Sequence, residues 1–352
     1  MSEFLKQFLR DDVRKLANDG QRALFLGAFG KHPGWDDHIE ENASAPDLGL
    51  RTESLVLAKA ILYVHGLGRN IDSGAWEKLD PAQQLPTFNH LFLWVANDQF
   101  ILGRIWSSSD GKGRTRYPMV LAAHALGVPL HFGLSGLLPH LERLRNECCA
   151  ATTAVEVAAR LNQAREELRA CLPNCGRSVP LATELMTRFV HNPQFGSHHE
   201  GLLRILYQLQ GQTAAFAPGR FNPRGDPSSL RAQDLRTPAA GLEPETIFGA
   251  WTRLMRSHLD PAVPVLLLWP AGADWLDILI GEPAFEQFFC LRATTAKLPC
   301  VSEIPFNLDV AFRGHAQARL EALVRGDGAR VEMPKPAGSV VARLFDTIFR
   351  KR

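Results

Sequence analysis

The sequence predicts a mixed α/β fold of the α+β kind, with an antiparallel-rich sheet covered by helices on both faces. Two short apolar runs, residues 90–96 and 99–106, are separated only by Asn97 and Asp98, a pair that tolerates the positive φ of a tight hairpin turn. Both faces of these runs are apolar, so helices should cover the sheet on each side. A third strand should begin near Tyr117, after a polar loop.

The composition is that of an ordinary globular protein and excludes several classes of function. Of 352 residues, 45% are apolar and 22% are charged. The formal net charge is only +2, so no overall field would attract nucleic acid, and we expect no nucleic-acid partner. The longest apolar run, residues 263–269, is far shorter than the roughly 20 residues that span a bilayer, so we expect no transmembrane segment.

The sequence also indicates the cellular location and the state of the cysteines. No charged leader precedes an apolar segment that ends in small residues, so we expect a cytoplasmic protein. Six cysteines in so long a chain favour reduced thiols over a disulfide framework. The spacing of Cys171 and Cys175 is wider than that of a zinc-binding pair. We therefore expect no metal and no cofactor.

The pattern along the chain divides it into four regions. Residues 1–130 are expected to form an N-terminal α/β region, and residues 131–215 a helical insertion. Residues 216–243 are rich in Pro, Gly, Arg and Asp, which favours a loop or linker. Residues 244–352 are expected to form a C-terminal βα segment that ends in an amphipathic tail helix.

The elements before the hairpin are expected in the following order. Apolar residues at helical spacing over residues 4–16 predict an amphipathic helix. Residues 22–29 predict a strand that leads into a loop rich in Gly and Pro. A helix should open at Thr52 or Glu53 and cover one face of the sheet. The polar residues 70–88 should form a long surface connection.

The elements after the third strand follow from apolar spacing in the same way. Helices are expected over residues 133–172, 181–190, 200–209, 244–258 and 308–324, with one more around residues 275–280. A short apolar run over residues 263–269 predicts a buried strand. The tail, residues 339–352, has apolar residues on one side and ends in cations. Peripheral membrane contact is one interpretation of this tail, and a docking helix is the simpler one.

The loop that follows the first strand contains four possible metal ligands. They are His32, Asp36, Asp37 and His38, and a metal-dependent hydrolase would use such a set. However, their spacing is neither HxHxDH nor the HExxH of a metal-binding helix. Asp37 followed by Glu40 also resembles a capping box at the start of a helix. Metal binding through His32, Asp36 and His38 therefore stays an alternative.

The loop that follows the second strand of the hairpin is basic. It carries Lys112, Arg114 and Arg116 against a single acid, Asp110. Its glycines can turn main-chain N–H groups toward an anion. Because the loop lacks the GxxxxGK[ST] pattern and a strand-to-helix context, the sequence does not predict a nucleotide phosphate site. A solvated basic loop is the plainer interpretation.

Two of these segments resemble a known family. The first loop resembles the G-K-x-P-x-x-x-D element of the TagF/ImpM family of type VI secretion-associated proteins, through Gly30, Lys31, Pro33 and Asp37. The second resembles that family's S-x-D-x-x-G-R-x-[FY]-P element, with one extra residue, through Ser108, Asp110, Gly113, Arg114, Tyr117 and Pro118. Residues 268–272 and 281–285 resemble, more weakly, the tryptophan strand and the G-x-P-x-x-F helix start near the end of the family's sequences. His38 stands where the family has an aromatic residue.

The resemblance implies a non-catalytic, cytoplasmic accessory or post-translational regulator of type VI secretion. Such a protein acts through protein–protein contact, with a forkhead-associated-domain component of the apparatus as one partner. The residues expected at the contact are Lys31, Asp37, Asp110, Arg114 and Arg116, although a structural salt bridge is an equal interpretation of Arg114. The alternatives are the metal-dependent hydrolase and a longin-like scaffold for a peptide or small GTPase.

Overall fold

The strands form one seven-stranded sheet in which every pairing is antiparallel. The computed structural model describes residues 22–35, 46–172, 183–222, 232–294, 299–305 and 307–326. Its strands are β1 (Ala23–Gly30), β2 (Asn89–Ala96), β3 (Gln99–Ser107), β4 (Pro118–Leu126), β5 (Gln233–Pro238), β6 (Val265–Pro270) and β7 (Trp275–Ile280). Their order across the sheet is β1-β4-β3-β2-β6-β7-β5. The predicted α+β class is confirmed, and strands from both halves of the chain share the sheet.

The expected hairpin lies near the middle of the sheet. Ala96 pairs with Gln99 across the turn, and Asn97 has the positive φ of 50° that the sequence predicted for this position. Strand β2 also pairs with β6, which joins the N-terminal strands to the C-terminal ones. The hairpin therefore connects the two halves of the sheet.

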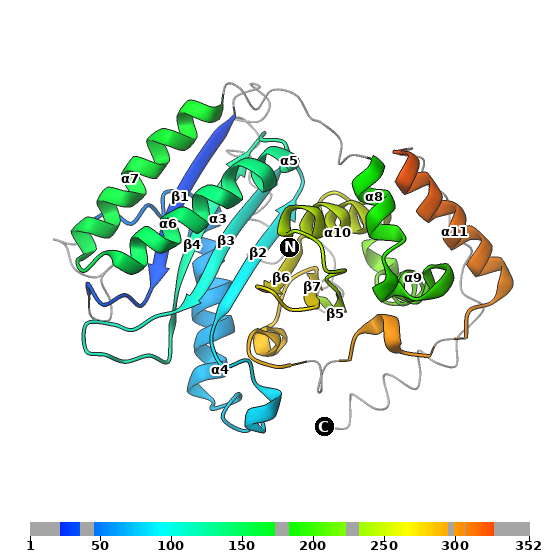
Figure 1. Cartoon of the computed structure of the whole chain (residues 1–352), viewed down its shortest axis with the longest axis horizontal. Coiled ribbons are helices and arrows are strands. Elements are labelled where there is room, and N and C mark those ends of the chain that lie inside the picture. Colours follow the sequence, from blue (N-terminus) through cyan, green and yellow to red (C-terminus); the bar gives the residue numbers. More distant parts are fainter. Residues whose placement is uncertain are drawn as a thin grey trace.

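Helices cover both faces of this sheet (Figure 1). Before the hairpin lie α3 (Glu53–Ala58), the π-helix η2 (Lys59–Gly68), α4 (Arg69–Asp72) and η3 (Pro81–Gln83). After β4 come α5 (Leu130–Phe132), η4 (Gly133–Leu137), α6 (Leu138–Ala150), α7 (Ala154–Cys171), α8 (Thr183–Val190), η6 (Pro193–Phe195), η7 (Ser197–His199), α9 (Glu200–Gln212) and η8 (Ala214–Phe216). The remaining helices are α10 (Pro244–His258), η10 (Phe285–Leu291), η11 (Val301–Glu303) and α11 (Val310–Arg325).

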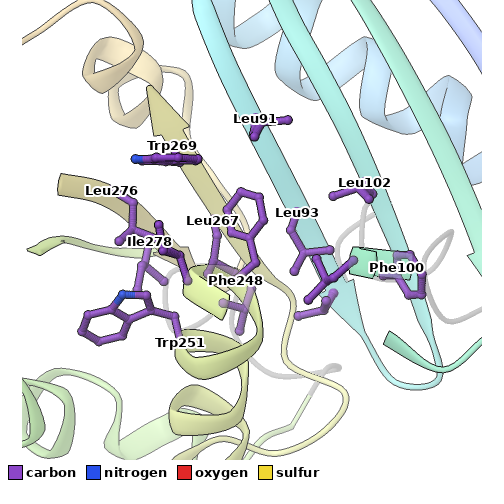
Figure 2. Packing of buried hydrophobic residues seen from close by; sticks show 14 of the residues in the cluster. Leu91, Leu93, Phe100, Leu102, Phe248, Trp251, Leu267, Trp269, Leu276 and Ile278 are labelled. Carbon is purple, nitrogen blue, oxygen red and sulfur yellow. The ribbon is translucent and has the colours of Figure 1, made fainter. Parts of the chain in front are cut away.

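Side chains that alternate along β2 belong to two separate cores. Leu91 and Leu93 pack in a core that includes α6, α7 and α10, whereas Phe92 and Trp94 pack in a core with α3, η2 and η10. Figure 2 shows the first of these cores, where side chains of β2 and β3 meet those of β6, β7 and α10. This alternation is what the two-sided apolar pattern predicted.

Helix α3, which packs in the core with Phe92 and Trp94, starts where the sequence predicted. The Thr52 side chain accepts a hydrogen bond from the Leu55 N–H and caps α3. The helix continues through η2, where a Cβ on Gly66 would lie only 2.7 Å from the Phe288 ring. This close approach lets η2 pack directly against η10 and closes the core over the sheet.

Three expectations about local structure are wrong. Residues 275–280 form strand β7 rather than a helix, because β6 and β5 pair with them on either side. Part of the expected loop, residues 233–238, is the edge strand β5. The connection over residues 70–88 is not wholly on the surface, since it buries Trp76, Leu79 and Phe88. The expected N-terminal helix and the C-terminal tail lie outside the described residues.

No helix among the described residues is long and apolar enough to cross a bilayer. The described cysteines are Cys148, Cys149, Cys171, Cys290 and Cys300, and none of them forms a disulfide with another. Cys175 lies outside the described residues, so nothing is said of its position relative to Cys171.

Candidate functional site

The two motif loops lie side by side at one end of the sheet. We call residues 30–35 and 108–117 the paired loops. Because β1 and β4 are neighbours, the end of β1 meets the start of β4, with Gly30 opposite Met119. The Lys31 N–H donates to the Pro118 carbonyl at 3.1 Å, and the Gly111 N–H donates to the Trp35 carbonyl at 2.8 Å. Two main-chain hydrogen bonds therefore join segments that are about 80 positions apart in the sequence.

Asp110 is the centre of the paired loops. Its Oδ1 accepts hydrogen bonds from the N–H groups of Lys112 and Arg114, each at 3.0 Å. Its Oδ2 accepts from Arg114 Nε at 2.7 Å and from Lys31 Nζ at 3.1 Å. The Asp110 side chain is fully buried, whereas that of Arg114 is 50% exposed. One carboxylate thus shapes its own loop and binds the other loop to it.

These contacts change the acidity of Asp110. Burial opposes ionisation, but the N–H groups of residues 112 and 114 and the Lys31 and Arg114 side chains favour the carboxylate. Together they hold the pKa of Asp110 well below its ordinary value of about 3.9. The ionised carboxylate therefore persists in the folded chain at pH values where an unfolded chain would already take up a proton.

We expect this difference in pKa to appear in the pH dependence of stability. Above pH ~4 the lowered pKa of Asp110 stabilises the folded state, and that contribution is lost as the pH falls further. Asp110→Asn has no proton to take up. The difference in melting temperature between wild type and Asp110→Asn should therefore be constant from about pH 7 to about pH 5 and shrink progressively as the pH falls from about 4 to about 2. A difference that stays constant down to about pH 2 would contradict the assignment.

Glycines allow the close approach of the paired loops. Gly30 has a φ of 106°, and a Cβ there would lie 2.4 Å from the Pro118 carbonyl oxygen. Gly113 has a φ of 76° and donates its N–H to the Asp110 carbonyl at 2.8 Å. Gly30 is therefore favoured both by its positive φ and by the lack of room for a Cβ beside Pro118, and Gly113 is favoured by its positive φ.

His32 is bound on both sides of its ring. Nδ1 accepts the Gly34 N–H at 2.9 Å, so Nε2 is assigned as the donor to the Cys148 carbonyl at 2.8 Å. The ring also stacks on Trp35, with 4.6 Å between centroids. Burial lowers the pKa of His32, against the opposing effect of the Cys148 carbonyl. This geometry fits a neutral packing histidine and leaves neither nitrogen open to a metal ion.

The rest of the predicted metal set cannot be placed. Asp36, Asp37 and His38 lie outside the described residues, and so does the predicted capping box at Asp37. Within the described ranges, no three His, Cys, Asp or Glu side chains come close enough together to hold a metal ion.

Tyr117 and Arg116 connect the second loop to α4. The Tyr117 hydroxyl donates to Asp72 Oδ1 at 2.7 Å, and burial, together with Asp72, raises the pKa of Tyr117 to about 12. The ammonium of Lys31 lies 5.8 Å from the centroid of the Tyr117 ring. Arg116 Nη2 donates to the Ile71 carbonyl at 2.8 Å and to Glu77 Oε1 at 3.0 Å. These contacts therefore hold the C-terminal end of the second loop against α4.

The predicted contact residues that the structure describes fall into two groups, and Asp37 is not among them. Lys31 is 13% exposed and Asp110 is buried, so they mainly hold the loops together. Arg114 and Arg116 are 50% and 61% exposed in their side chains and present guanidinium groups to solvent. Of the remaining motif residues, Pro33 is exposed and Ser108 is half-buried. The Arg114–Asp110 ion pair is also the structural salt bridge that the sequence left as an alternative.

Sequence reasoning missed the role of Trp35. Its indole N–H donates to the Gly30 carbonyl at 3.0 Å, and its own carbonyl accepts from Gly111. A tryptophan directly after a Pro-Gly turn was a usable signal, because a buried indole needs a hydrogen-bond acceptor.

No protein-family model, curated protein or solved structure matches this chain, so the resemblance to the TagF/ImpM family rests on the motif residues themselves.

Proposed function

We propose that this chain is a non-catalytic accessory or regulator of type VI secretion that acts in the cytoplasm through protein–protein contact. The proposal starts from the resemblance of the two loops to the TagF/ImpM motifs. On this proposal, Arg114 and Arg116 contact an acidic surface of the partner, and Lys31 and Asp110 hold the loops in shape. The expected partner is the forkhead-associated-domain component of the apparatus.

The observation that supports the proposal is the pairing of the two loops around Asp110. Motif residues that are distant in the sequence converge on one carboxylate, with two guanidinium groups at the surface beside it. The polar side chains at the centre of the loops make structural hydrogen bonds. His32 bonds to main-chain groups, and Lys31 and Arg114 bond to Asp110. Such an arrangement suits recognition by a rigid surface more than the movement of protons or electrons.

Charge reversal at the exposed arginines tests the proposal. We expect Arg114→Glu combined with Arg116→Glu to weaken binding of the co-expressed forkhead-associated-domain component at least tenfold, since the contact would then be repulsive. Affinity can be measured by co-purification followed by biolayer interferometry. The matched control is Arg169→Glu at the end of α7, because Arg169 is 52% exposed and pairs with one carboxylate, as Arg116 does. Equal loss in the control, or no binding by the wild type, would contradict the proposal.

A further inference from the structure

A cavity of about 400 Å³ lies directly beside the paired loops. Arg116 and Thr115 of the second loop line it, together with Ser107 at the end of β3 and Phe88 just before β2. Arg292, which follows η10, also lines it. The cavity is therefore built from three segments that are distant in sequence, and it opens at the same end of the sheet as the proposed contact surface.

Two arginines that line this cavity leave part of their hydrogen-bonding capacity unused. Arg116 uses only Nη2, toward the Ile71 carbonyl and Glu77. Arg292 uses only Nε, toward the Leu85 carbonyl at 2.8 Å, and its guanidinium lies 5.1 Å from the centroid of the Phe88 ring. Among the described residues, the remaining N–H groups of these two arginines have no hydrogen-bond partner. They are donors in a fixed position beside an open space.

The charge of the cavity selects the kind of anion. Its lining holds two cations, Arg116 and Arg292, and one acid, Glu77. The formal charge is therefore 2 − 1 = +1, which a single carboxylate neutralises. A phosphorylated side chain carries between about −1.5 and −2 at neutral pH and would leave an excess of negative charge. Charge balance thus favours a carboxylate.

The walls indicate that the carboxylate belongs to a peptide. Trp76 and Phe88 form the apolar floor, and their rings meet edge to face with 5.7 Å between centroids. Exposed Pro86, Thr87 and Thr115 form a rim that can contact a main chain. An extended segment can therefore insert an acidic side chain between the guanidinium groups while its neighbours rest on the rim.

We propose that this cavity binds the carboxylate of an acidic side chain from an extended segment of the protein partner. The inference rests on the proposed function, because it gives the partner its chemistry, but it can be tested separately. Arg292 becomes a specificity residue that the motif resemblance does not include. Arg116 takes a double role, at the exposed surface and at the cavity.

Peptide titration followed by NMR chemical-shift changes tests the inference. The probes are acetyl-Gly-Phe-Glu-Phe-Gly-amide and the matched peptides with glutamine or phosphoserine at the central position. We expect the glutamate peptide to bind at least tenfold more tightly than the glutamine peptide, with the shifts centred on residues 76–88 and 115–116. Equal binding of both peptides, or tighter binding of the phosphoserine peptide, would overturn the inference.

Variants of the cavity separate binding from structural damage. Arg116→Gln and Arg292→Gln should each weaken the glutamate peptide at least fivefold, and Arg169→Gln should leave its affinity unchanged. Glu77→Gln should strengthen binding several-fold, since it removes the competing carboxylate, and a damaged fold would not produce such a gain. Weaker binding by Glu77→Gln, or no effect of Arg116→Gln, would overturn the inference. Peptide binding without capture of a forkhead-associated-domain protein would instead contradict only the proposed function.

Discussion

Replacement of Asp277 by Ala is expected to lower the free energy of unfolding by about 3–5 kcal/mol. Asp277 lies opposite Arg236 in the β5–β7 pair, and the two side chains form a bidentate ion pair at 2.7 Å on both arms. They are 6% and 2% exposed, respectively. Removal of the carboxylate would therefore leave a buried guanidinium whose remaining acceptor is the Ala293 carbonyl at 3.1 Å.

The ionised form of this pair is supported by its geometry. Burial raises the pKa of Asp277 and the Arg236 charge opposes that rise, whereas the nearby carboxylate raises the pKa of Arg236 despite its burial. The two-armed contact between a planar guanidinium and a carboxylate is typical of a charged pair, so we take both groups as ionised at neutral pH.

Urea unfolding of the wild type, of Asp277→Ala and of the double variant Arg236→Met, Asp277→Leu tests the prediction. Asp277→Ala should lose the stated free energy, while Arg236→Met combined with Asp277→Leu should be more stable than Asp277→Ala, since an apolar pair leaves no unpaired charge. A loss below about 1 kcal/mol in Asp277→Ala would show that the pair adds little to the edge of the sheet.

A comparable loss, about 3–5 kcal/mol, is expected for Trp251→Ala. Trp251 of α10 is fully buried and meets Phe189 of α8 edge to face, with 5.1 Å between centroids. Its indole N–H donates to the Pro238 carbonyl at the end of β5, at 3.1 Å. In Figure 2, Trp251 points from α10 toward the side chains of β7. The side chain thus connects the helical region to the C-terminal part of the sheet.

The same unfolding measurement gives a graded control for this residue. Trp251→Phe keeps most of the ring volume but loses the hydrogen bond to Pro238, so its loss should be well below that of Trp251→Ala. Val310→Ala, at a side chain that is 88% exposed, should change the free energy by less than about 0.5 kcal/mol. Equal losses in the two Trp251 variants would argue against a packing origin.

Much of the fold follows from patterns that are local in the sequence. The hairpin around Asn97, the two-sided apolar character of β2 and the bounds of α10 were all predicted, because each depends on spacing within a few residues. Local pattern failed at β7 and β5. A six-residue apolar run fits a strand and a buried helix equally well, and β5 has too few apolar residues to be recognised.

The candidate site divides in the same way. The sequence identified the two polar loops and the residue types in them, since Gly, Pro and charged residues mark turns at the ends of strands. Their pairing through Asp110, and the cavity between Arg116 and Arg292, depend on contacts between residues that are far apart in the chain. Strand order decides such contacts. Because β1 lies beside β4 and β2 beside β6, side chains 79 and more positions apart become neighbours, and no short-range periodicity carries that information.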